Sequence, residues 1–144
     1  MSAFTTQQKV RFGHVDPAGI AYFPRIYDYL HEAFEELWEL HVGVRYYALI
    51  GEHRIGFPLV HSEVDFTHPL RFGDRPIVRV TCFHLGRSSI GLRYRYLLDE
   101  KLCLDARMTT AAVNLDTMKP IPIPTEYRAR FEAILEEPQR ESGA

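Results

Sequence analysis

Residues 24–41 read PRIYDYLHEAFEELWELH, and their apolar side chains recur at alternating spacings of four and three. That spacing places them on one face of an α-helix. Pro24 suits the first turn of a helix, because its missing N–H is not needed there. At about 1.5 Å per residue the segment forms a rod of roughly 27 Å, which can cross a small sheet. We expect Gly43 to end this helix. The stripe consists of Ile26, Leu30, Ala33, Leu37 and Leu40, widened by Tyr27, Phe34 and Trp38.

On both sides of this helix the hydrophobic period changes to two, which is typical of strands with one buried face. The strand segments are 4–12, 60–67, 78–84, 90–98 and 102–115. Turn residues at 73–74 and 86–89 predict two hairpins. Helical patterns predict a short helix over 46–51 and a final helix over 125–137.

The strands need a shared apolar partner, and only the helix over 24–41 is long and apolar enough to cover them. The predicted fold class is therefore α+β, with an antiparallel sheet of five or six strands wrapped around one long central helix, plus a C-terminal helix. Open sheet edges in so small a domain favour pairing with a second copy, so we expect a homo-oligomer.

Composition restricts the classes of partner. The 144 residues carry 17 Lys and Arg against 19 Asp and Glu, a formal net charge of −2, which provides no field for binding a nucleic acid. No apolar run suits a signal peptide or a membrane span, so we expect a cytoplasmic protein without a membrane partner. We predict one domain over residues 1–137 and a flexible tail over 138–144. Cys82 and Cys103 are expected to be reduced thiols in the sheet.

The segment that leads into the helix, residues 11–24, reads RFGHVDPAGIAYFP. Asp16, Pro17 and Gly19 stand at the first, second and fourth positions of a type I turn, and turn chemistry alone is one sufficient interpretation of them.

The same segment resembles the signature of the 4-hydroxybenzoyl-CoA thioesterase-like branch of the hotdog-fold family, which places an Asp-Pro-Ala-Gly-Ile run between the first strand and the central helix. Residues 68–74, HPLRFGD, are similar to that family's turn between its second and third strands. The order of elements agrees from Phe4 to Leu135. The resemblance implies a hotdog fold and an acyl-CoA thioesterase, which converts an aryl- or short/medium-chain acyl-CoA to the free acid and coenzyme A.

The resemblance also implies how the protein assembles and what it binds. Coenzyme A belongs to the substrate, so no resident cofactor is implied. The pockets are expected between subunits of a homodimer or of a homotetramer built as a dimer of dimers. A carrier-protein thioester remains an alternative to coenzyme A, and the acyl group stays open.

Individual residues acquire roles from the resemblance. Asp16 is expected to attack the thioester carbonyl or to activate a water, while the Phe23 backbone N–H donates to the oxyanion. The helix N-terminus beyond Asp16 favours the ionised carboxylate that this role needs. His14 is a secondary catalytic candidate. The expected substrate contacts are Gly19, Tyr22 and His61, with Arg87, Ser88 and Ser89 at the nucleotide, and Tyr46, Tyr47 and Phe57 are further candidates.

Two rival functions keep the fold. Enoyl-CoA hydration in another hotdog branch uses an Asp followed five residues later by a His, but Ala21 occupies that position here. A non-catalytic module that binds acyl thioesters is the second rival, and release of free thiol separates it from an enzyme. Glu32 and Glu36 on the helix could replace Asp16 as the acid, although their spacing equally fits a solvated face. The seven histidines show no metal-binding motif, and Ser88-Ser89 lacks the Gly-x-Ser-x-Gly elbow of serine hydrolases.

Overall fold

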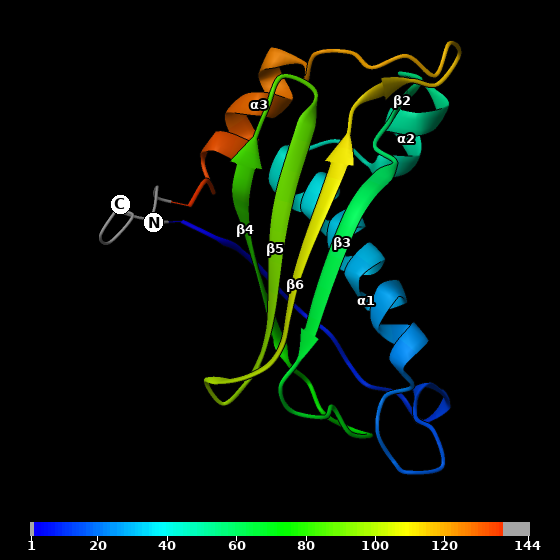
Figure 1. Cartoon of the computed structure of the whole chain (residues 1–144), viewed down its shortest axis with the longest axis vertical. Helices are drawn as coiled ribbons and strands as arrows, with labels where there is room; N and C mark the ends of the chain where they lie inside the picture. Colours follow the sequence, from blue (N-terminus) through cyan, green and yellow to red (C-terminus); the bar gives the residue numbers. More distant parts are fainter. Residues whose placement is uncertain (1, 137–144) are drawn as a thin grey trace.

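A five-stranded antiparallel sheet curls around one long helix in the computed structural model, which describes residues 2–136 (Figure 1). The strand order is β1-β4-β5-β6-β3, and a second, two-stranded sheet pairs β2 with β7. The strands are β1 Phe4–Gln7, β2 Ile55–Gly56, β3 Leu59–Phe66, β4 Ile77–Leu85, β5 Ser89–Leu98, β6 Lys101–Ala111 and β7 Val113–Asn114. The helices are η1 Phe12–His14, α1 Phe23–Glu36, η2 Leu37–Val42, α2 Tyr46–Gly51 and α3 Thr125–Glu132. The predicted α+β architecture is confirmed, and the predicted tail at 138–144 lies outside the described residues.

The central helix changes its winding near its end. Residues of α1 that face the sheet are buried, but η2 continues the rod as a π-helix and ends at Gly43, which has a left-handed φ of 94°. A π-helix has more residues per turn than an α-helix, so side chains rotate away from the positions that a 3.6 period predicts. Leu40, expected in the buried stripe, is therefore 69% exposed. Trp38 is fully buried instead, with ring centroids 4.9 Å from Phe57 and 5.4 Å from Phe131.

The first strand and one predicted hairpin differ from expectation. β1 ends at Gln7 rather than Phe12, although the Val10 N–H still donates to Asp74 O at 2.9 Å. The expected hairpin through 73–74 is wrong, because Gly73 N–H donates to Val10 O and the strands it joins do not pair. The hairpin that the sequence missed joins β5 to β6 through residues 99–100, and both of these residues have a positive φ.

Both cysteines lie in strands of the main sheet. Cys82 and Cys103 are both unpaired and buried, and burial raises the pKa of the Cys82 thiol to about 11. No helix within residues 2–136 combines the length and apolar character that crossing a membrane requires.

The outer face of the sheet is polar and carries one well-ordered ion pair. Arg93 on β5 donates two hydrogen bonds to Asp105 on β6, at 3.0 and 2.7 Å, and the two side chains are only 16% and 18% exposed. The hydrogen bonds from Arg93 lower the pKa of the Asp105 carboxyl, against the opposing effect of partial burial. Bidentate, partly desolvated pairs of this kind are the ion pairs that contribute to stability.

This pair predicts a pH dependence of stability. Because the pKa of Asp105 is lower in the folded state, its contribution is present above the unfolded value near about 4 and is lost as the pH falls through the folded value. We expect Asp105→Asn to lower the free energy of unfolding by about 1.5–3 kcal/mol at pH 7, and this difference from the wild type to shrink below about pH 4. Urea unfolding at a series of pH values measures it. A difference that stays constant down to pH 2 would contradict the pairing.

Candidate active site

Asp16 is held by the turn that the sequence predicts. Its backbone carbonyl accepts the N–H of Gly19 at 2.9 Å, and its Oδ1 accepts the N–H of Ala18 at 2.9 Å. Gly19 has a φ of 80°, a conformation that glycine adopts without strain. The other carboxylate oxygen of this half-buried side chain accepts no hydrogen bond from residues 2–136. The turn thus orients the carboxylate with one oxygen left for water or a ligand.

Two backbone hydrogen bonds fasten this loop at the start of α1. Ala21 N–H donates to Leu70 O at 2.7 Å, and Tyr22 N–H donates to His14 O at 2.8 Å. Phe23 follows as the first residue of α1, and no described residue accepts its N–H. The free N–H groups and the dipole of a helix N-terminus attract negative charge. The loop therefore brings a carboxylate and a free donor to the same end of one helix.

The His14 ring is held by Tyr29, a buried residue of α1. Its Nδ1 lies 2.8 Å from the Tyr29 hydroxyl and accepts the Arg11 N–H at 3.3 Å. Burial raises the pKa of Tyr29 to about 12, so the phenol keeps its proton at neutral pH. Because both neighbours can donate, Nδ1 acts as an acceptor and the neutral ring carries its proton on Nε2. His14 thereby connects the loop, through its ring and its carbonyl, to both α1 and Tyr22.

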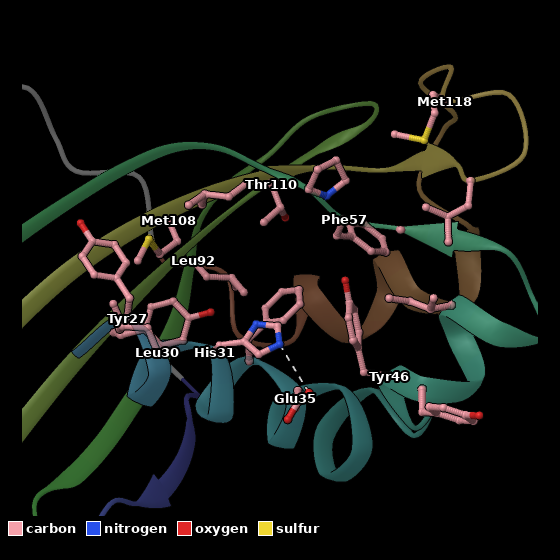
Figure 2. A pocket seen from close by; sticks show the side chains of 18 residues that line it. Tyr27, Leu30, His31, Glu35, Tyr46, Phe57, Leu92, Met108, Thr110 and Met118 are labelled. Atoms are coloured by element: carbon pink, nitrogen blue, oxygen red, sulfur yellow. Dashed lines mark ion pairs between the residues drawn. The ribbon is translucent and has the colours of Figure 1, made fainter. Parts of the chain in front are cut away.

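Two cavities flank α1. The smaller, about 340 Å³, lies beside the Asp16 loop and is lined by Ile20, Ala21, Phe23 and Ile26 together with Phe66–Leu70 and Cys103–Leu104. The larger, about 690 Å³, lies between α1, α2 and the sheet and is mostly apolar. Figure 2 shows His31 and Tyr46 directed into it from the helices and Thr110 from the strand side. The larger cavity has the size and apolar character of small-molecule sites.

Comparison with known proteins places this geometry in a family. The model of the thioesterase-like superfamily matches residues 10–131. The chain belongs to that superfamily. A 1,4-dihydroxy-2-naphthoyl-CoA hydrolase from Synechococcus sp. (strain WH7803) is 30% identical over 135 residues, which cover 89% of this chain and 88% of that protein.

Solved structures of thioesterase superfamily proteins are similar to this chain. A thioesterase superfamily protein from Jannaschia sp. CCS1 aligns with a TM-score of 0.88 at 28% identity, covering 94% of this chain and 95% of that one. A 1,4-dihydroxy-2-naphthoyl-CoA thioesterase from Synechocystis aligns with a TM-score of 0.81 at 26% identity, covering 90% and 96%. The prediction of a hotdog-fold thioesterase family is confirmed.

Within this thioesterase-like chain, the two groups of predicted site residues lie far apart. The Asp16 loop bonds Leu70, shortly before the first residue of β4, whereas the 86–89 turn follows the last residue of that strand (Figure 1). At about 3.3 Å per residue, β4 separates them by roughly 30 Å. Asp16, Gly19, Tyr22, Phe23 and His14 therefore gather at one end of the sheet, and Arg87, Ser88 and Ser89 at the other.

The 86–89 turn is built largely by backbone and local bonds. Arg87 O accepts the Ile123 N–H at 2.9 Å, Ser88 O accepts the Ala112 N–H at 2.7 Å, and Ser89 Oγ lies 2.9 Å from His84 Nε2. The exposed Arg87 side chain forms no ion pair with any described residue, so its charge is available to an anion.

His61 lies outside both cavities. It projects from the outer face of β3, where its Nε2 is 2.9 Å from Glu63 Oε1, whereas the cavities lie on the helix side of the sheet. Tyr46, Tyr47 and Phe57 do line the larger cavity. No three His, Cys, Asp or Glu side chains in the described chain are arranged to hold a metal ion.

Tyr29 and Thr110 are residues that the sequence did not single out. Tyr29 stands three residues after Ile26 on the buried face of α1, where a tyrosine needs a partner for its hydroxyl. Thr110 continues the inward row of β6 after Leu104, Ala106 and Met108. A hydroxyl in an inward, apolar row is the signal that could have selected both of them.

The His14 contact predicts the effect of removing one hydroxyl. We expect Tyr29→Phe to lower the free energy of unfolding by about 1 kcal/mol, because it removes a buried hydrogen bond while keeping the ring. Tyr96→Phe is the matched control, since the Tyr96 hydroxyl is buried without a partner and its removal should cost nothing. Denaturant unfolding compares the two. Equal losses in both variants would show that the Tyr29–His14 bond contributes no stability.

Proposed function

We propose that this thioester hydrolase cleaves an aromatic acyl-CoA and that the Asp16 carboxylate is its nucleophile or general base. The observation that carries the proposal is the placement of Asp16: its own turn holds one oxygen, the other is free, and the first free N–H of α1 follows the same loop. A fixed carboxylate beside unpaired donors suits acyl transfer, in which negative charge develops on a carbonyl oxygen.

The reaction follows from these groups. Asp16, or a water from which it takes a proton, adds to the thioester carbon, and the carbonyl oxygen becomes an oxyanion that the Phe23 N–H stabilises. Collapse of this intermediate breaks the carbon–sulfur bond and releases the coenzyme A thiolate. In the general-base route Asp16 passes the proton taken from water to this thiolate. In the nucleophilic route the acyl group is left on Asp16 as an anhydride, which a water then hydrolyses, and a proton of that water balances the thiolate. One water is consumed overall, and the free acid and coenzyme A are formed. Loss of one oxyanion donor costs roughly 2.7–4 kcal/mol in other enzymes, so the position of the loop matters as much as the nucleophile.

His14 has a supporting part in this proposal. Its Nε2–H is free to donate, whereas its Nδ1 is occupied, so it can orient a carboxylate or a water but is not arranged to accept a proton through Nδ1. Its carbonyl also fixes Tyr22, the residue before the oxyanion donor.

An aromatic acyl group suits the larger cavity. Its wall includes the rings of Tyr27, Phe34, Tyr46, Phe57 and Tyr94. Flat rings stack and pack edge-on against such side chains. The curated relative named as a 1,4-dihydroxy-2-naphthoyl-CoA hydrolase supports the same substrate class.

Cytoplasmic location and the absence of a resident cofactor stay predictions.

A homodimer would join this cavity to the catalytic loop. β3 is an edge strand with exposed Leu59, Val60 and Phe66, and such an edge favours pairing with a second copy. Antiparallel pairing of two β3 strands places the Leu59 end of one against the Phe66 end of the other. Leu59 lines the larger cavity, while Phe66 lines the smaller cavity beside the Asp16 loop, so each cavity would face its partner's loop.

The same arrangement accounts for the distant Arg87. β4 separates it from Asp16 within one chain, and in the proposed dimer the two residues that serve one substrate come from different protomers. Arg87, Ser88 and Ser89 would then hold the nucleotide of a coenzyme A whose thioester lies at another protomer's Asp16.

Removing the charge of Asp16 tests the mechanism. We expect Asp16→Asn to lower kcat by at least about 100-fold on aryl-CoA thioesters, because the amide keeps the oxygen that holds the turn but cannot act as nucleophile or base. Thiol release measured with a disulfide reagent follows the reaction. Asp28→Asn is the control, since it makes the same chemical change at an exposed position of α1. The Asp28 Oδ2 atom lies 3.6 Å from Arg25 Nη1 in a surface ion pair. Unchanged turnover of Asp16→Asn would remove this carboxylate from the mechanism.

Blocking the β3 edge tests the assembly. Val60 is 61% exposed, and we expect Val60→Lys to convert the oligomer to a monomer and to reduce activity at least about tenfold, because a lysine on an edge strand opposes pairing. Leu40→Lys changes an equally exposed side chain on η2 and should leave assembly unchanged. Sedimentation velocity and thiol release measure both effects. A wild-type protein that is active as a strict monomer would contradict the shared site.

A further inference from the structure

Thr110 is a buried polar side chain without a partner. It is 7% exposed, and its Oγ1 neither donates nor accepts a hydrogen bond within residues 2–136. A buried hydroxyl left unpaired destabilises a fold, and native proteins rarely keep one unless something outside the chain completes it. A valine has the same shape and would avoid this cost. Trp38 Nε1 and the Tyr96 hydroxyl are also buried without a partner in the described chain, but neither residue lines one of the two cavities, so only Thr110 is placed to find its partner in a ligand.

The place of Thr110 shows where that partner binds. Thr110 lines the larger cavity from β6, and Figure 2 shows its side chain directed into the cavity, opposite His31 and Tyr46. On the strand side the lining residues Leu92 and Met108 are apolar, and Tyr94 of β5 is the other residue that carries a hydroxyl. Thr110 is thus a hydrogen-bonding group in a largely apolar wall, an arrangement that orients a ligand.

The charge of the cavity restricts the ligand group. Apart from tyrosines, the ionisable residues that line it within the described chain are His31 and Glu35, whose side chains are 60% and 53% exposed and whose Nε2 and Oε1 atoms lie 3.4 Å apart. No Lys or Arg among residues 2–136 lines the cavity to neutralise a buried carboxylate, and the carboxylate of Glu35 lies at the exposed helix side. A neutral group that both donates and accepts, such as a hydroxyl, matches the threonine hydroxyl.

We propose that Thr110 determines substrate specificity by exchanging a hydrogen bond with a hydroxyl group on the aromatic ring of the acyl moiety. This inference rests on the proposed function and adds to it the residue that distinguishes hydroxylated from unsubstituted aryl thioesters. A site built to hydrogen-bond a ligand hydroxyl discriminates against the analogue that lacks it, because its own polar group is then left unpaired.

A comparison of isosteric variants tests the inference. The probes are benzoyl-CoA and its 2-, 3- and 4-hydroxy derivatives. The wild type is expected to prefer at least one hydroxylated isomer by about 10- to 100-fold in kcat/KM, and Thr110→Val is expected to abolish that preference. Thr109→Val is the matched control, because the adjacent threonine lies on the outer face of the sheet and should leave the preference unchanged.

Folding and assembly are checked in the same proteins. Thr110→Val removes an unpaired hydroxyl, so its thermal midpoint is expected to equal or exceed that of the wild type. An equal loss of kcat/KM on all four substrates, with a normal thermal midpoint, would overturn the inference by giving Thr110 a general rather than a selective part.

Binding separates this inference from the proposed function. Equilibrium binding of the same four thioesters to the Asp16→Asn protein, with and without Thr110→Val, reports the hydroxyl preference without turnover. Suppose that the wild type releases no thiol, but that binding still favours a hydroxylated thioester and Thr110→Val abolishes this preference. That result would overturn only the proposed reaction. A preference that Thr110→Val leaves intact, or no preference at all, would overturn only the inference.

Discussion

Burial of the apolar stripe of α1 against the inner face of the sheet is the interaction on which the other features of this molecule depend. Each large apolar side chain buried there contributes about 1.5–3 kcal/mol, and Ile26, Leu30 and Phe34 all belong to the stripe. The stripe fixes the direction and the rotation of the helix against the sheet, and Pro24 together with the backbone bonds of the preceding loop sets where the helix begins. The Asp16 loop, the free Phe23 N–H and the buried Tyr29 all take their positions from that start.

The same packing gives the Asp16 loop and the larger cavity different surroundings. The Asp16 loop is tied by backbone bonds to Leu70 and by the His14 ring to Tyr29, so its geometry is set within one chain. The larger cavity, in contrast, opens beside the edge strand β3, and the Thr110 hydroxyl in its wall has no partner among residues 2–136. The groups proposed to be catalytic, whose positions must be exact to a fraction of an ångström, are thus held by the fold, whereas the proposed substrate-binding surface lies at the edge where we propose that a second protomer pairs.

Some elements of the fold could be predicted because their signals are local. The helix over 24–41 and the turn at Asp16 follow from periodicity and from proline and glycine positions, and the structure confirms both. The hairpin through 73–74 was wrong because turn residues show that the chain bends but not which strands then pair. The true hairpin at 99–100 contains Asp and Glu with positive φ and no glycine, so its sequence carries a weak turn signal.

Sequence by itself determined the elements, the apolar stripe and the family resemblance, since each depends on residue types within a short window or a recognisable motif. Tertiary structure alone decided which residues share a site. It separated Arg87 from Asp16 by the length of β4, put His61 on the outer face, and turned Leu40 outward through the π-helix. It also joined Tyr29 to His14 and left Thr110 unpaired in a cavity wall. The physical reason is that proximity in space arises from how helix and sheet pack, and linear spacing does not encode that distance.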